Sequence, residues 1–195
     1  MKNYIIKQIA DSAATKQAIL ENEPLLEMIV TVAKACVEVY RQGKKTMLAG
    51  NGGSAADAQH IAAELVGRYG FDRPSIPSLA LTTDTSNLTA IGNDYGYDKV
   101  FSRQLEGMAQ EGDIFIGIST SGNSQNIINA FESAKDRGVT TVALVGRDGG
   151  KMAAMADYAI IIPSNATPRI QESHILIGHI LCDIIEKELF GGGVA

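Results

Sequence analysis

The chain has 195 residues, which is enough for one domain with a substantial core and short for two domains joined by a linker. Hydrophobic residues make up 45% and charged residues 20% of the sequence, values that exclude a disordered or fibrous protein. The formal net charge is −5 and the lysines and arginines are scattered, so we expect no binding to nucleic acid.

Two amphipathic helices are expected at the start of the chain. Apolar residues recur at helical spacing over residues 4–20 and 24–42. We expect residues 1–42 to form leading helices. From residue 43 onward, short apolar runs alternate with turn signals and helical patterns. The runs that we expect to be strands are 46–50, 78–81, 113–119, 140–145 and 158–162.

Strands that alternate with helices predict right-handed crossover connections. We therefore expect a single α/β domain, with a doubly wound, five-stranded parallel sheet flanked by helices. A helix over about residues 168–189 closes the core of residues 43–190, and residues 191–195 are expected to be a flexible tail. Ligands of such folds bind outside the carboxyl ends of the strands, so the turns after Gly50 and Ser119 are the expected site.

Both turns have residues that suit an anion. The first contains two glycines and then Ser54, a good N-cap for the next helix, and the second is rich in hydroxyls before a helix over 126–137. Either alone could be an ordinary strand-to-helix turn. Two in one sheet, without a Walker lysine or a dinucleotide fingerprint, favour a sugar phosphate over a nucleotide. The residues expected to line the site are Asn51, Gly52, Gly53, Ser119, Thr120, Ser121 and Ser124.

Together, the runs 49–54 and 117–124 resemble the sugar isomerase (SIS) domain family, and specifically its phosphoheptose isomerase branch. The resemblance covers nearly the whole chain, including the leading helices and the segments 90–94 and 169–174. The serine-rich run alone marks only the broad family, whereas the combination is specific. The resemblance implies an enzyme that converts sedoheptulose 7-phosphate to D-glycero-D-manno-heptose 7-phosphate, a precursor of the heptose in bacterial lipopolysaccharide.

The resemblance also implies how the substrate is held. The phosphate would rest on the serine-rich run, and the sugar would meet the glycine turn, Asn93, Asp94 and Gln171. From the residues alone, Asn93 and Asp94 could equally be turn formers. Arg68 could bind substrate or pair with an acid at the surface.

A metal site is suggested by His60 and Glu64, which lie four residues apart on one face of the helix after the first turn. Taken alone, any histidine of this chain could be an ordinary helix residue. The resemblance implies one Zn²⁺ per subunit, held by His60, Glu64, Gln171 and His179. Imidazole and carboxylate suit zinc, although a glutamine oxygen is an infrequent ligand. His174 is interpreted as a residue that supports a metal ligand or faces the substrate.

The spacing of the late ligands bears on assembly. Gln171 and His179 are about 12 Å apart along a helix, whereas bonds to zinc are only about 2 Å long. Our hypothesis is that one of the two reaches the site from a neighbouring subunit. This agrees with the homotetramer that the resemblance implies, in which the leading helices pack in the oligomer and the active sites are shared.

Aldose and ketose phosphates interconvert through an enediolate, which requires a base and an acid that act in turn. We expect Glu64 to remove and return the carbon-bound proton and His179 to be the acid. One alternative is a non-catalytic SIS-domain adaptor of the bacterial replication initiator, in which the catalytic glutamate and late histidine are replaced. Another is an isomerase of a different sugar phosphate.

Cys36 and Cys182 lie far apart in apolar segments, which is typical of reduced core thiols. Polar residues interrupt the N-terminal segment before a signal-peptide core develops, and no later segment reaches the roughly 20 apolar residues of a membrane span. We expect a cytoplasmic protein with no membrane contact.

Overall fold

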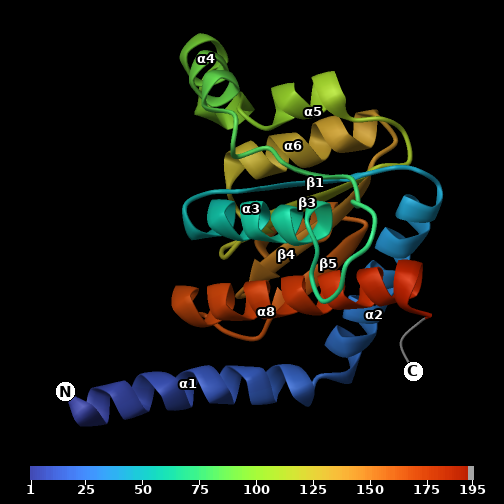
Figure 1. Ribbon diagram of the computed structural model, residues 1–195. Coiled ribbons are helices and arrows are strands. Elements are labelled where there is room, and N and C mark those ends of the chain that lie inside the picture. Colours follow the sequence, from blue (N-terminus) through green and yellow to red (C-terminus); the bar gives the residue numbers. More distant parts are fainter. Residues whose placement is uncertain (193–195) are drawn as a thin grey trace.

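The computed structural model describes residues 1–192 (Figure 1). The strands are β1 (Thr46–Gly50), β2 (Ser78–Ala80), β3 (Ile114–Ser119), β4 (Thr140–Gly146) and β5 (Tyr158–Ile162). The α-helices are α1 (Lys2–Leu20), α2 (Glu23–Arg41), α3 (Gly53–Val66), α4 (Thr85–Tyr95), α5 (Ser102–Met108), α6 (Gln125–Asp136), α7 (Gly150–Met155) and α8 (Thr167–Glu186). A 3₁₀ turn, η1 (Tyr97–Lys99), follows α4, and a π-helical turn, η2 (Lys187–Gly191), follows α8.

The strands form one parallel sheet in the order β2-β1-β3-β4-β5. Because successive side chains point to opposite faces, each strand contributes to two cores. Leu48 and Ile116 pack with α2, α3 and α8, whereas Met47 and Phe115 pack with α5, α6 and α7. The predicted doubly wound, five-stranded α/β fold is therefore confirmed.

The strand order reverses between β1 and β3, which is where folds of this kind bind their ligands. The chain leaves β1 into α3 on one face of the sheet and leaves β3 into α6 on the other. At such a reversal the two loops diverge, and the carboxyl ends of the strands open a crevice. Both loops singled out in the sequence follow the two strands at this reversal.

Helix α1 extends along one side of the molecule and reaches beyond the sheet (Figure 1). Its first half carries exposed apolar side chains, with Tyr4 67% and Ile9 65% exposed. Its later half is tied to α8, because Ser12 and Lys16 both donate hydrogen bonds to Glu172. Oligomer packing by the leading helices stays a prediction that this exposed surface favours.

Local details differ from the sequence-based expectations. The N-cap of α3 is Gly52, not Ser54, because Gly52 adopts a φ of 57° and the helix begins two residues earlier than expected. Asn93 lies within the last turn of α4, so the segment before Gly96 is helical. Of the predicted tail, Gly191 is the last residue of η2 and Gly192 caps this turn. Residues 193–195 lie outside the described residues.

Cys36 and Cys182 are free and buried, as predicted for core thiols, and burial raises the pKa of each to about 12. Within residues 1–192, none of the helices is both long enough and apolar enough to cross a membrane.

Candidate functional site

Helices α3 and α8 lie side by side on one face of the sheet (Figure 1). Gly178 on α8 makes the close approach possible, because a Cβ at this position would lie 2.6 Å from Cδ1 of Ile61. One turn later, Sγ of Cys182 lies 3.9 Å from the Ile61 carbonyl oxygen. The two helices run in the same direction, so residues at matching depths along them meet.

Three potential metal ligands meet between these helices. Nε2 of His60 lies 3.1 Å from Oε1 of Glu64 and 3.3 Å from Nε2 of His179. All three ligand atoms lie within 4.8 Å of one another. Two ligands of a tetrahedral zinc stand about 3.3 Å apart, so these side chains fit that ion and leave a fourth position open. The side chain of His60 is 48% exposed, which gives a ligand access from solvent.

Gln171, the fourth predicted ligand, lies elsewhere on the same helix pair. Its amide packs against Gly53 at the start of α3, where a Cβ would overlap it. His179 is two turns further along α8, about 12 Å away along the helix axis. One chain therefore brings three of the four predicted ligands together. Gln171 lies instead beside the glycine loop, which consists of Asn51, Gly52 and Gly53.

The serine-rich loop has the features of an anion site. Oγ of Ser119 lies 2.9 Å from Oγ of Ser124, the N-cap of α6, whose side chain makes no capping hydrogen bond. The loop turns at Gly122, with a φ of 65° and the Gly149 backbone in close contact. Thr120 and Ser121 are half-buried beside it. Hydroxyls and the positive end of α6 thus converge on one loop.

A pair of asparagine side chains joins the two loops. Asn51 donates to Oδ1 of Asn126 and accepts from its amide, with both distances 2.9 Å. The Tyr97 hydroxyl also donates to Oδ1 of Asn51, at 3.1 Å. The Asn51 side chain therefore holds the two loops together beside Gly52 and Gly53. Asn126 and Tyr97 were not predicted from the sequence as residues of the site.

Asn93 and Asp94 form an exposed pair at the end of α4, with Nδ2 of Asn93 donating to Asp94 at 2.8 Å. The bond from Tyr97 to Asn51 fixes the following turn against the glycine loop. Arg68 is exposed, and its guanidinium forms no ion pair within residues 1–192.

His174 is buried, so the interpretation that it faces the substrate is wrong. Its Nε2 lies 3.1 Å from the Val145 carbonyl oxygen on β4, which requires the proton on this nitrogen. Burial lowers the pKa of His174 to about 4. This histidine is a neutral core residue that holds α8 against the sheet.

The family of the chain follows from comparison with known proteins. The model of the SIS domain matches residues 9–146. A phosphoheptose isomerase of Sulfurimonas denitrificans is 78% identical over the full length of both chains. The chain belongs to the phosphoheptose isomerase family. The resemblance noted in the sequence is thereby confirmed.

Two other phosphoheptose isomerases agree with this assignment. That of Aneurinibacillus thermoaerophilus is 61% identical, over 97% of this chain and 96% of its own. The solved structure of phosphoheptose isomerase from Neisseria gonorrhoeae has a TM-score of 0.90 and 45% identity, and the match covers 95% of this chain and 98% of that one. The phosphoheptose isomerase fold therefore spans essentially the whole chain, leading helices included.

The buried His174 makes stability depend on pH. Its pKa is about 4 when folded against 6.5 in its ordinary state, so between these values only the unfolded chain takes up the proton. Its contribution to stability is complete above pH 6.5 and is lost as the pH falls. Between about pH 7.5 and about pH 5, we expect the free energy of unfolding of the wild type to fall by about 2 kcal/mol because of His174. The His174→Gln variant should not show this loss. Urea unfolding of both proteins measures this, and an equal loss in both would contradict it.

Proposed function

We propose that this protein is a phosphoheptose isomerase that converts sedoheptulose 7-phosphate to D-glycero-D-manno-heptose 7-phosphate, and so supplies heptose for bacterial lipopolysaccharide. The observation that carries the proposal is the meeting of Glu64 with His60 and His179 between α3 and α8. The adaptor alternative is not favoured, because the 78% identical relative is named as the isomerase and both proton-transfer residues are present.

Glu64 and His179 suit the two halves of the proton transfer. The carboxylate of Glu64 forms no ion pair with lysine or arginine within residues 1–192, and only Oε1 faces His60. Oε2 is therefore the oxygen that we expect to remove the proton from one carbon and return it to the next. The imidazole of His179, within 4.8 Å of that carboxylate, then exchanges a proton with the adjacent substrate oxygens.

We propose that His60, Glu64 and His179 hold one Zn²⁺, for which their spacing and chemistry fit. When bound, zinc would polarise the carbonyl and hydroxyl oxygens of the substrate. The protein would supply the rest of the charge stabilisation from hydrogen-bond donors at the site.

The phosphate is expected at the serine-rich loop. Ser119, Thr120, Ser121 and Ser124 supply hydroxyls, and α6 adds its positive N-terminal end. Because the net charge of the chain is −5, such local donors have to attract the anion. The sugar hydroxyls would meet the glycine loop, Asn93, Asp94 and Gln171.

We further propose that each active site is completed by two copies of a homotetramer. Glu64 lies in the last turn of α3, about 16 Å along the axis from Gly53 at the crevice. A heptose phosphate on the serine-rich loop of one chain does not span that length. The Gln171 amide and both loops of one copy would therefore face His60, Glu64 and His179 of another. The exposed apolar side chains of α1 supply a surface for this assembly.

Glu64→Gln tests the role of the base directly. The amide keeps the shape of the side chain but cannot accept the proton, so we expect turnover of sedoheptulose 7-phosphate to fall about 10²- to 10⁴-fold. The assay follows product formation by zinc-loaded protein, with chelator-treated protein in parallel. Glu106→Gln, the same change at an exposed site on α5, should leave turnover unchanged. Undiminished turnover by Glu64→Gln would remove Glu64 as the base, and an inactive wild type would favour the adaptor.

Mixing two inactive variants tests the shared site. Glu64→Gln lacks the base, and Ser121→Trp blocks the serine-rich loop. A homotetramer of either variant alone should therefore be inactive. After the subunits are unfolded and refolded together in equal amounts, about one quarter of composite sites would combine two intact halves. Recovered turnover near that fraction supports sharing. Sites that lie within single chains would give no recovery.

A further inference from the structure

A buried ion pair joins the ends of the two site helices. Nε of Arg73, in the loop after α3, lies 2.9 Å from Oε2 of Glu186 at the end of α8, and both side chains are only 1% exposed. Removing two charges from water costs about as much as their attraction returns, so such a pair contributes little net stability by itself. What it supplies is a fixed geometry between the segments that it joins.

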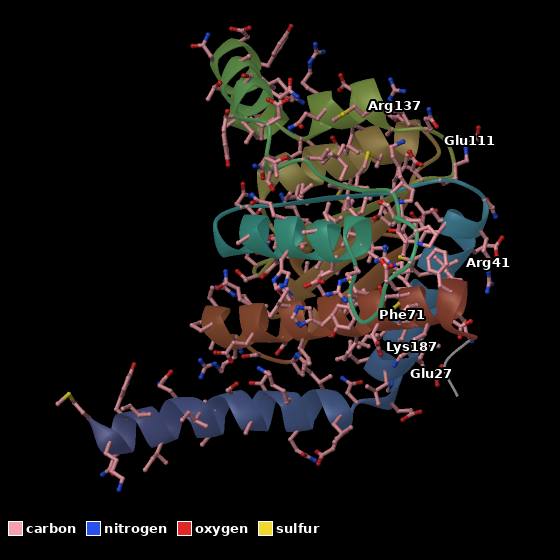
Figure 2. All side chains as sticks on the ribbon, in the orientation of Figure 1. Glu27, Arg41, Phe71, Glu111, Arg137 and Lys187 are labelled. Atoms are coloured by element: carbon pink, nitrogen blue, oxygen red, sulfur yellow. The ribbon has the colours of Figure 1, made fainter. Side chains whose placement is uncertain are left out.

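Glu186 occupies a loop of backbone donors. Its carboxylate accepts from the N–H groups of Tyr69, Gly70 and Phe71, at 2.8, 2.6 and 3.2 Å. Three successive N–H groups that donate to the two oxygens of one carboxylate form an anion-binding nest. Burial alone would raise the pKa of Glu186, but these donors and Arg73 lower it, and the net direction is down. Figure 2 shows Phe71 over this end of α8, where a Cβ on Gly191 would lie 3.3 Å from its ring.

Arg73 closes the other side of the arrangement. Its Nη2 donates to the Glu64 carbonyl oxygen at 2.9 Å, and its Nη1 donates to those of Leu65 and Gly67 at 2.7 and 3.1 Å. These carbonyls end α3 and lack partners within the helix. The guanidinium therefore caps the turn that carries Glu64, with a charge that the helix end favours.

Both residues of the ion pair are connected to the metal-ligand cluster of His60, Glu64 and His179. Arg73 holds the backbone of Glu64, and Glu186 holds the backbone of Tyr69, whose ring centroid lies 5.8 Å from that of His179. Glu186 itself lies two turns beyond His179 on α8. The ion pair thus fixes the end of α3 against α8. This is the part of the helix pair in which the ligand atoms of Glu64 and His179 have to lie a few ångströms apart.

We propose that Arg73 and Glu186 are positioning residues that set the separation of Glu64 and His179, and hence the affinity of the site for metal. This inference rests on the proposed zinc site. Neither side chain touches metal or substrate. Each acts through the backbone of α3 and of the loop that follows it.

The test measures the zinc affinity of metal-free protein by competition with a chromophoric chelator, at a temperature where circular dichroism shows each variant folded. Glu186→Gln removes the charge, and Arg73→Lys keeps the charge but not the fork of donors to the carbonyls at the end of α3. We expect each to weaken zinc binding about 10- to 100-fold, as for other residues that orient metal ligands. Arg73→Lys carries the test by itself if Glu186→Gln does not fold.

Asp113→Asn is the matched control. Asp113 is also a fully buried carboxylate, paired with Lys45 at 2.6 Å, and it shares no partner with Arg73 or Glu186. Its loss should lower the melting temperature but leave zinc affinity within about twofold of wild type. Wild-type affinity in folded Arg73→Lys, or an equal loss in Asp113→Asn, overturns the positioning role alone. A wild type that binds no zinc overturns the proposed metal site, and the positioning role with it.

Discussion

The contact of α3 with α8 at Ile61 and Gly178 is the constraint on which the site depends. Because Gly178 has no side chain, the helices approach closely enough for the imidazoles of His60 and His179 to meet at 3.3 Å. Glu64 then joins them through the turn of α3 alone. If α3 and α8 were further apart, His60, Glu64 and His179 would be three ordinary surface residues. The packing of Ile61 against Gly178 therefore determines whether these side chains can act together.

The sequence was informative where structure is local. Alternating strands and helices gave the sheet and its crevice, and the four-residue spacing of His60 and Glu64 gave half of the ligand cluster. His179 came only from the family resemblance, since no local pattern reveals which residue of α8 faces α3. The Asn51–Asn126 and Arg73–Glu186 pairs were missed for the same reason, as their partners are far apart in the chain. The short helices α4, α5 and α7 were not singled out because their patterns are brief.

The separation of the two halves of the site explains why assembly would matter for activity. The serine-rich loop lies at the carboxyl end of β3, where α6 begins, and the cluster of His60, Glu64 and His179 lies near the far end of α3. A rigid helix cannot shorten that distance within one chain. Gln171, beside Gly53, marks the place where a second copy would bring its ligand cluster.

The most direct measurement is a zinc anomalous difference map from crystals of the zinc-loaded protein. We predict one zinc per chain, about 2.0–2.2 Å from atoms of His60, Glu64 and His179 of one copy, with Gln171 of a different copy facing the open position. Zinc bound elsewhere, or at a site that lacks Glu64 or His179, would contradict it.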